Sequence, residues 1–163
     1  KRLLLAVGLA SHTLALGNSV PKLYPCKGHY FDYTANSPFT HLIYPMPGEQ
    51  GLGIHATLNL QNGLRFGPDV HYQNDGNYRF SASKKDFVAA IKNYWPGLQA
   101  EKLQPSYTGV RAKIQAPNAS VSDFVIQTEK DHGMANLVQL FGIESPGLTA
   151  SLAIAQEVAQ HYG

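Results

Sequence analysis

His55 is the residue of this sequence best placed for acid–base chemistry. Residues 53–60 alternate apolar and polar side chains, a period of two that is typical of a β-strand with one polar face. His55 falls on the polar face beside Gly51 and Gly53, and glycines in a strand permit the close approach of a ligand or of another backbone. A neutral imidazole there could accept the proton of a substrate hydroxyl. The alternative is a hydrogen-bonded surface histidine.

Three basic side chains in predicted strands are candidates for binding a carboxylate. A guanidinium group binds a carboxylate through two parallel hydrogen bonds, so Arg111 is the candidate for a first anchor. A dicarboxylate substrate needs a second anchor, for which Arg65 and Lys113 are candidates. Tyr44 and Tyr30 could line a pocket with a polar tip. The alternatives are solvated strand charges for the basic residues, and core tyrosines with one hydrogen bond each.

The end of the sequence reads as a strand, a tight turn and a helix. Residues 137–143 are an apolar run with the length and composition of a buried strand, and the run breaks at residues 144–147. Apolar residues then recur with helical spacing at Leu148, Leu152, Ala155 and Ala159. Ser145 is the predicted N-cap, with Pro146 at the first helical position. The free N–H groups of a helix start suit an anion or a polarised carbonyl, although ordinary packing explains most such units.

The remaining elements predict an α+β fold with a mostly antiparallel sheet that has one apolar and one polar face. We expect helices from residue 9 to Leu16 and at residues 84–94, a loop at residues 45–51 and a turn at residues 131–133. The other predicted strands lie at residues 3–8, 28–33, 39–44, 53–60, 64–66, 103–114 and 123–127. The N-terminal segment KRLLLAVGLASHTLA also resembles a secretory signal, but we favour an internal strand and helix.

Composition excludes several classes of protein. The length of 163 residues fits a single domain, 44% of the residues are hydrophobic and 15% are charged. The formal net charge is +2 and no Lys/Arg run exceeds two residues, so we predict no nucleic-acid partner. The seven histidines lack metal-site spacing, which predicts no metal, and the single Cys26 excludes an internal disulfide. No apolar segment reaches the ~18–20 residues that span a bilayer. We expect a cytoplasmic protein for which peripheral membrane association is possible.

Four stretches, taken together, resemble a known family. They are KGHYF at residues 27–31, LIYPMPGEQGLGIHATLNLQNGLRFGPDV at 42–70, GVRAKIQAP with DFVIQ within 109–127, and GIESPGLTASLAIAQEVA at 142–159. In this order they resemble the C-terminal part of the FAD-dependent oxidoreductases of the D-amino-acid oxidase (DAO) superfamily. Within it they are most similar to the L-2-hydroxyglutarate dehydrogenase/oxidase branch. The family begins with a strand, a GxGxxG motif and a helix that hold the FAD diphosphate, and this sequence has no such motif.

The resemblance implies that residues 1–163 are the C-terminal, substrate-binding and flavin-capping part of a larger enzyme. Its FAD-binding N-terminal half would be missing or on a separate chain, and the isolated chain would be inactive. Hydride would pass from C2 of a small 2-hydroxy acid, similar to L-2-hydroxyglutarate, to flavin N5. His55 would be the base and Arg111 the carboxylate anchor, because Arg111 falls where relatives have a Gly-hydrophobic-Arg-Pro segment near the flavin; here Ala112 replaces the proline.

The closing turn would meet the pyrimidine edge of the flavin, and a helix N-terminus there stabilises the negative charge of the reduced ring. The residues implied to bind the cofactor are Gly142, Ile143, Glu144, Ser145, Pro146, Gly147, Leu148 and Thr149. We expect the Glu144 side chain to point away from this site or to pair with a cation. The turn at residues 5–8, LAVG, departs from the Asn-Ala-Ala-Gly-like turn of the family, which leaves an FAD contact there unassigned.

Two alternatives remain open at this stage. A related amine or amino-acid oxidase would share the flavin chemistry, with the pocket deciding which substrate enters. A non-catalytic binding domain from a truncated gene is the other possibility, and the absence of the phosphate-binding motif from this sequence supports it. The sequence does not decide which substrate is used or which molecule accepts the electrons.

Overall fold

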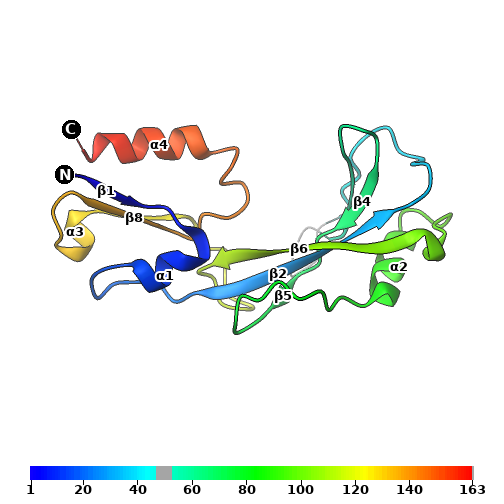
Figure 1. Ribbon diagram of the computed structural model, residues 1–163, viewed down its shortest axis with the longest axis horizontal. Coiled ribbons are helices and arrows are strands. Elements are labelled where there is room, and N and C mark those ends of the chain that lie inside the picture. The colour runs from blue at the N-terminus through cyan, green and yellow to red at the C-terminus, as the bar shows by residue number, and fades with distance from the viewer. Residues whose placement is uncertain (47–52, 163) are drawn as a thin grey trace. The chain divides into compact units, whose positions relative to one another are not determined.

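The computed structural model describes residues 1–46 and 53–162, and Figure 1 shows its elements. The strands are β1 (Leu3–Leu5), β2 (Tyr24–Tyr33), β3 (His55–Leu58), β4 (Leu64–Gly67), β5 (His71–Tyr72), β6 (Leu103–Lys113), β7 (Val125–Gln127) and β8 (Leu137–Phe141). The α-helices are α1 (Ser11–Leu14), α2 (Lys84–Lys92), α3 (Glu129–His132) and α4 (Ser151–Gln160), and short 3-10 helices lie at Gly8–Ala10 and Ala100–Lys102. Within these residues the fold is α+β, with a mostly antiparallel five-stranded sheet and a separate three-stranded sheet, as predicted at that level.

The chain divides into two compact units. Unit 1 comprises Lys1–Cys26, Tyr72–Gly76 and Arg111–Gly163, and unit 2 comprises Lys27–His71 and Asn77–Val110. The division falls within β2 and within β6, so each of these strands contributes residues to both units. Two units of one domain and two separate domains would both divide in this way. The single domain expected for residues 1–163 therefore stays a prediction.

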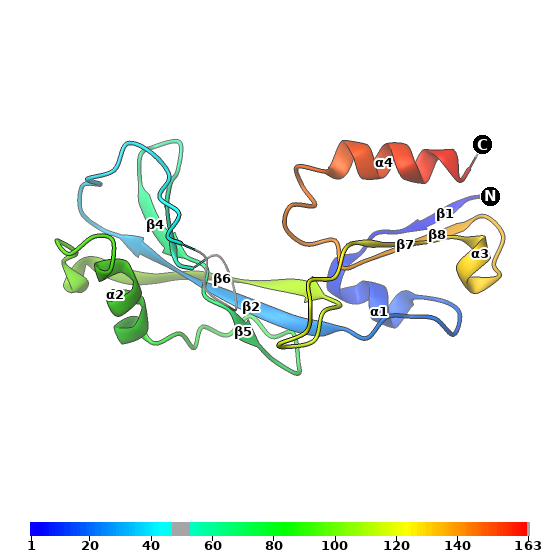
Figure 2. The same ribbon diagram turned by 180° about the vertical axis from the view of Figure 1, so that it is seen from behind.

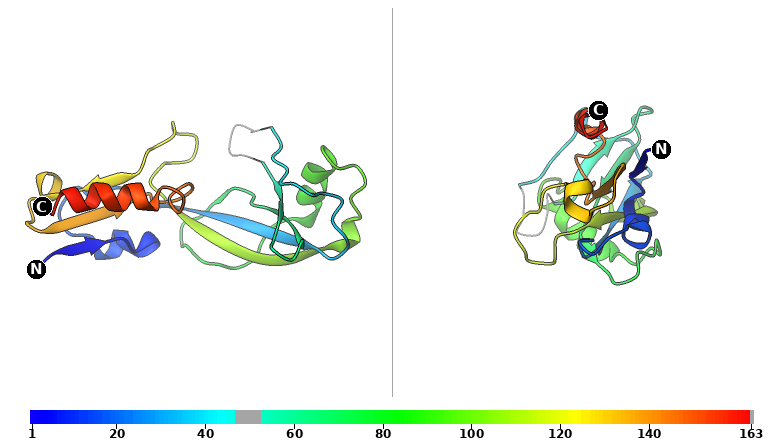
Figure 3. Two further views of the ribbon diagram at one scale, coloured as in Figure 1. Left: turned by 90° about the horizontal axis from the view of Figure 1, so that it is seen from above. Right: turned by 90° about the vertical axis from the view of Figure 1, so that its left-hand side faces the viewer.

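β8 is the central strand of unit 1, and all five of its residues are buried. It pairs in parallel with β1 and antiparallel with β7, which gives the sheet order β1-β8-β7. α4 and α1 lie on opposite faces of this sheet (Figures 1 and 3). On the α4 face, Val138 and Leu140 form an apolar cluster with Ile154 and Val158 of the helix. A strand covered on both faces needs a continuous apolar run, and the sequence of β8 supplies one.

Gln139 is the polar exception in β8, and it is fully buried on the α1 face. Its side-chain amide binds both backbone groups of Leu16: the Leu16 N–H donates to Oε1 at 2.7 Å, and Nε2 donates to the Leu16 carbonyl at 2.9 Å. These bonds offset the cost of burying the amide and fix the chain after α1 to the sheet. The expected helix through Leu16 ends at Leu14, because Leu16 bonds to β8 and not along a helix.

The start and the packed face of α4 differ from the prediction. The helix begins at Ser151 with Ala150 as its N-cap, and no side chain caps it, so Ser145 and Pro146 precede the helix. Residues 145–150 form turns held by local bonds, such as the one from the Ala150 N–H to the Pro146 carbonyl at 3.0 Å. The packed stripe is Ile154, Val158 and Tyr162, whereas the predicted stripe through Leu148, Leu152, Ala155 and Ala159 is exposed.

Two shorter predictions also need correction. The strand expected at residues 39–44 is reduced to one bridge, between Ile43 and Ala56 of β3. The turn expected at residues 131–133 is mostly the last part of α3, because a capping box between Thr128 and Asp131 starts a helical turn there. Residues 47–51 of the predicted loop at 45–51 lie outside the described residues.

The sheet of unit 2 has one apolar and one polar face, as its alternating sequence predicts. β4 pairs antiparallel with both β2 and β3. Phe31 of β2 and Phe66 of β4 are buried on the apolar face and form one core cluster with Phe87 and Ile91 of α2. Figure 2 shows α2 beside this sheet. α2 starts where the sequence predicts, because the Ser83 side chain accepts a hydrogen bond from the Asp86 N–H at 3.3 Å.

The buried face of β2 continues into two polar residues, Lys27 and His29, which are 3% and 1% exposed. The Lys27 ammonium donates to Asn77 Oδ1 at 2.7 Å and to the Arg79 carbonyl at 2.9 Å. His29 Nδ1 lies 2.9 Å from the Asp69 carboxylate, and its Nε2 lies 3.2 Å from the Ser81 hydroxyl. These bonds hold the irregular chain between β5 and α2 against the sheet.

Candidate functional site

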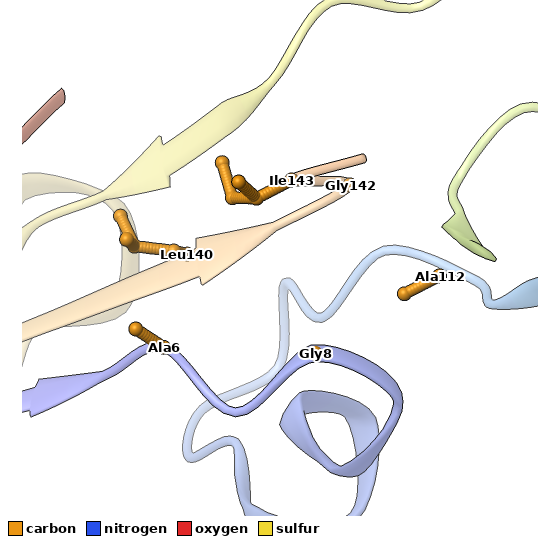
Figure 4. Close-up of a pocket in the computed structure, with 6 residues that line it drawn as sticks. All are labelled: Ala6, Gly8, Ala112, Leu140, Gly142 and Ile143. Atoms are coloured by element: carbon orange, nitrogen blue, oxygen red, sulfur yellow. The ribbon is translucent and has the colours of Figure 1, made fainter. Parts of the chain in front are cut away.

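Unit 1 contains a pocket of about 180 Å³ at the carboxyl ends of its two parallel strands. Figure 4 shows Ala6 and Gly8, which follow β1, across from Gly142 and Ile143, which follow β8. The remaining lining residues are Ala112 of β6 and Leu140 of β8. In open α/β sheets, ligands bind outside the carboxyl ends of parallel strands, and this pocket occupies that place.

Small residues keep this pocket open. Gly8 and Gly142 have φ angles of +58° and +67°, a conformation that favours glycine. A Cβ atom on Gly142 would lie 2.9 Å from Cγ1 of Ile114, so a larger residue there would displace its neighbour. Two glycines and two alanines in one lining leave room for the flat face of a ring system. Such a lining permits the close approach of a planar ring, such as that of a flavin.

The predicted cofactor segment, Gly142 to Thr149, divides into two parts. Gly142 and Ile143 line the pocket. Ser145, Pro146, Gly147, Leu148 and Thr149 lie in the turns before α4, and Leu148 is 91% exposed. A Cβ on Gly147 would lie 2.6 Å from the Glu144 carbonyl oxygen, so this glycine is required by the turn itself. Because α4 begins at Ser151, the helix start does not lie at Ser145, where the sequence predicted an anion-binding terminus.

Glu144 pairs with a cation, as expected. Its carboxylate lies 2.6 Å from the Lys113 ammonium, and both side chains are less than one-fifth exposed. Lys113, a candidate substrate anchor, is thus engaged within unit 1. Arg111 is half-buried in the same strand, and its Nε donates to the Cys26 carbonyl at 3.4 Å. Burial raises the pKa of the nearby Tyr72 phenol, while the positive charges of Lys113 and Arg111 oppose that shift.

Unit 2 brings two of the predicted residues into contact on the polar face of its sheet. The rings of Tyr44 and His55 lie 4.3 Å apart between centroids. In the antiparallel register, His55 faces Gly67 and Thr57 faces Arg65, so Arg65 lies on the same face as His55. Gly53 is described, with φ +74°, while Gly51, which the sequence also placed beside His55, lies outside the described residues.

Arg65 already binds a carboxylate of its own chain. Its Nε donates to Asp32 Oδ1 at 2.6 Å, and its Nη2 donates to Oδ2 at 3.3 Å. The Ser106 hydroxyl donates to the same carboxylate at 2.8 Å, and the guanidinium lies 4.8 Å from the centroid of the Tyr107 ring. Tyr107 in turn stacks on Tyr30 with 4.5 Å between centroids. The guanidinium of Arg65, a candidate for binding a substrate carboxylate, therefore already binds Asp32.

The Asp32–Arg65 pair shifts the pKa of both side chains. The hydrogen bond from Arg65 lowers the pKa of the Asp32 carboxyl; Ser106 adds to the effect and partial burial opposes it. The hydrogen bond to Asp32 raises the pKa of Arg65. Asp32 could not be predicted as the partner of Arg65, because the two residues lie far apart in the chain and only the register of β2 with β4 makes them neighbours. Ala6 and Gly8 fall in the turn at residues 5–8, which was left without an assigned FAD contact because its sequence departs from that of the family, and Ala112 was noted only as the replacement of a proline; all three line the pocket.

The described residues show neither a metal centre nor a membrane-spanning helix. No group of three or more His, Cys, Asp or Glu side chains within residues 1–46 and 53–162 could hold a metal ion. In the same residues, no helix has the length and apolar character needed to cross a bilayer.

Comparison with known proteins identifies the family. Helices on both faces of a parallel strand pair, with a pocket at the carboxyl ends, are typical of α/β proteins that bind nucleotide cofactors. The profile of the FAD dependent oxidoreductase (DAO) family matches residues 1–161. The chain belongs to this family, which confirms the resemblance drawn from its motifs.

Two relatives and one solved structure show what this chain is similar to. The chain is 42% identical over 156 residues to the mitochondrial L-2-hydroxyglutarate dehydrogenase of Arabidopsis thaliana, covering 88% of this chain and 32% of the relative. It is 24% identical to the glycerol 3-phosphate dehydrogenase of Caloramator mitchellensis, covering 86% of this chain and 28% of the relative. The chain thus spans about a third of the length of these relatives.

The solved structure is the dithionite-reduced L-α-glycerophosphate oxidase of Mycoplasma pneumoniae with FAD bound. It superposes with a TM-score of 0.80 and 22% identity, over 98% of this chain and 42% of the oxidase chain. At this level of identity the likeness shows the fold.

We predict that Asp32→Asn lowers the free energy of unfolding at pH 7 by up to about 1 kcal/mol, a small effect because both partners are more than one-third exposed. Since the folded-state pKa of Asp32 lies below the ordinary value of 3.8, the contribution is complete above that value and is lost as the pH falls through the folded-state pKa. Urea unfolding at pH 7 and at pH 3 measures the difference. Glu101→Gln, an exposed change in the same unit, is the control; equal losses for both variants would contradict the assignment.

Proposed function

We propose that this chain is the C-terminal part of an FAD-dependent enzyme that oxidises a small 2-hydroxy acid similar to L-2-hydroxyglutarate. The observation that carries the proposal is the 42% identity, over 88% of this chain, to a relative named L-2-hydroxyglutarate dehydrogenase. The pocket at the carboxyl ends of β1 and β8 supports the cofactor part of the proposal.

The residues that would hold FAD are those that line this pocket, with Gly8 and Gly142 admitting the ring at close range. FAD, when bound, accepts a hydride from the carbon that carries the substrate hydroxyl. A segment outside this chain, the FAD-binding N-terminal half, would hold the diphosphate, because no GxGxxG motif is present in this sequence. Residues 144–149 would then shape the rim of the pocket, without supplying a helix terminus.

The substrate would need a base and a carboxylate anchor. His55 is the proposed base, and its contact with Tyr44 fixes the plane of the ring beside a phenol that can share hydrogen bonds with a substrate. Arg111 is the proposed carboxylate anchor. Arg65 and Lys113 are weaker candidates for a second anchor than their residue types suggested, because each is paired with a carboxylate of the chain.

Flavin absorbance and substrate turnover of the full-length protein test the proposal directly. L-2-hydroxyglutarate is the expected substrate, and glycerol 3-phosphate is the second candidate, because relatives named for it match at 24–28% identity. Turnover of an amine or amino acid would assign the protein to the related oxidases. A full-length protein that binds no flavin would favour a non-catalytic binding domain. A cytoplasmic location stays a prediction.

Ala6→Leu should weaken FAD binding by the full-length protein, because the larger side chain enters the pocket. Overpacking of this kind costs about 1–3 kcal/mol, which is roughly a five- to hundredfold increase in Kd. Ala6 is exposed at the end of β1, so the fold should tolerate the change. Titration of the apoprotein with FAD measures the Kd. The same substitution at the exposed Ala119 is the control, and an unchanged Kd for Ala6→Leu would place the flavin elsewhere.

Arg111→Lys in the full-length enzyme should raise KM for a carboxylate substrate by about ten- to a hundredfold. A point charge replaces a planar fork, and a charge-assisted contact worth roughly 1.5–3 kcal/mol is weakened. Steady-state kinetics measures KM and kcat. Arg79→Lys, in the chain between β5 and α2, is the matched control; unchanged kinetics for Arg111→Lys would remove Arg111 from the substrate site.

His55→Ala should lower kcat/KM by about 10²–10⁴-fold if the imidazole accepts the substrate proton. FAD binding should stay normal in this variant, because His55 does not line the flavin pocket. A flavin spectrum together with steady-state kinetics separates the two effects. A variant that binds FAD and turns over at the wild-type rate would make His55 a structural residue.

A further inference from the structure

An ion pair joins two of the segments that border the pocket of unit 1. Ala112 of β6 and Ile143, which follows β8, both line the pocket (Figure 4). The next residues along the chain are Lys113 and Glu144, and their side chains meet at 2.6 Å between Nζ and Oε1. The pair therefore fixes the end of β6 to the segment after β8, directly beside the pocket.

This pair lies where a charge acts strongly on its surroundings. The side chains of Lys113 and Glu144 are 19% and 18% exposed, so water and salt screen them less than they screen a surface pair. Partly buried charges interact at an effective dielectric constant well below that of water. The six residues that line the pocket have uncharged side chains. A charge left unpaired at position 113 or 144 would therefore act on whatever occupies the pocket.

The phenol of Tyr72 shows how the two charges act on a neighbouring group. Burial raises the pKa of this phenol, Lys113 lowers it and Glu144 raises it. The two members of the pair thus act with opposite sign on one half-buried group. A phenol that ionises and a flavin ring that is reduced both gain negative charge, so each member of the pair should act on a flavin in the same sense as on Tyr72.

We propose that Lys113 is a positioning residue that holds the Glu144 carboxylate beside β6 and cancels its charge, so that this carboxylate does not oppose reduction of the flavin. The role rests on the proposed function, because it requires FAD in the pocket. An unpaired carboxylate there would repel the negative charge that the ring gains on reduction, and an unpaired ammonium would attract it. The pair would thereby help to set the reduction potential, while other residues bind the substrate.

The reduction potential of the full-length, flavin-loaded protein at pH 8 tests the pair through the sign of its change. Lys113→Met leaves Glu144 unpaired and should lower the potential, whereas Glu144→Gln leaves Lys113 unpaired and should raise it. Each shift should correspond to at least about a tenfold change in the ratio of the Kd values of oxidised and reduced flavin, which is about 30 mV for a two-electron couple. The double variant should return close to the wild-type potential.

The opposite signs distinguish an electrostatic role from a merely structural one. Either single substitution removes the same ion pair, so a structural pair would give two variants whose potentials move alike or not at all. Lys113→Arg keeps the positive charge and should stay near the wild-type potential. Glu157→Gln, at a side chain of α4 that is 54% exposed and lies 3.6 Å from His161, removes the same charge elsewhere in unit 1. As the control, it should leave the potential unchanged.

Equal potentials for the wild type and both single variants would overturn the proposal, and so would shifts of the same sign. If one single variant fails to fold, the sign of the other decides. The measurement needs bound flavin and no substrate. A protein that shows the expected potentials but oxidises no 2-hydroxy acid would refute the proposed substrate and still confirm the role of the pair. A wild-type full-length protein without flavin absorbance would refute both proposals.

Discussion

The burial of β8 on both faces is the constraint on which unit 1 depends. All five residues of this strand are buried, so each face needs its own cover. α4 supplies one cover through Ile154 and Val158, and the chain around α1 supplies the other. The carboxyl end of β8 then has a fixed place beside that of β1, and the pocket follows from this arrangement. Removing either cover would therefore disturb the pocket without touching its lining.

In unit 2 only one face of the sheet is buried, and a single helix, α2, covers it. Its sheet buries Phe31 and Phe66 under α2 and leaves the opposite face polar. Such a face can hold His55, Arg65 and Asp32 side by side without the cost of burying charge. It also lets the charges neutralise one another, which is why the Asp32–Arg65 pair forms. A basic residue on a polar sheet face is thus a poor indicator of an anion site unless the neighbouring strands are known.

The sequence predicted elements best where one periodicity was unambiguous. The alternation at residues 53–60 predicted both β3 and its polar face, and the serine before the apolar stripe of α2 predicted the start of that helix. α4 shows the limit of such patterns. Its sequence contains two adjacent apolar stripes, and only the neighbouring sheet decides which one packs. The strand expected at residues 39–44 failed for a similar reason, because strand composition alone does not supply a partner.

The candidate site was predictable where a motif within one segment identifies it, and not where it depends on contacts between segments. The motif pointed to Gly142 and Ile143, which line the pocket, while the role of His55 stays a prediction. The cation expected beside Glu144 is Lys113, and identifying it required the fold. The motif identified Gly142, but it assigned no contact to the departing turn that contains Ala6, and Ala112 has no chemical group that indicates a pocket, because these two residues matter only through the space that they leave. Contacts between distant strands decide what such residues do.

The buried ammonium of Lys27 has a consequence for how this protein tolerates change. One of its hydrogen bonds goes to the main-chain carbonyl of residue 79 and not to a side chain. Every amino acid carries that carbonyl, so this bond depends on the position of the backbone and does not constrain which side chain residue 79 has. Asn77, which receives the other bond through its side chain, has no such freedom. In this connecting segment, substitutions should therefore be tolerated at position 79 and not at position 77.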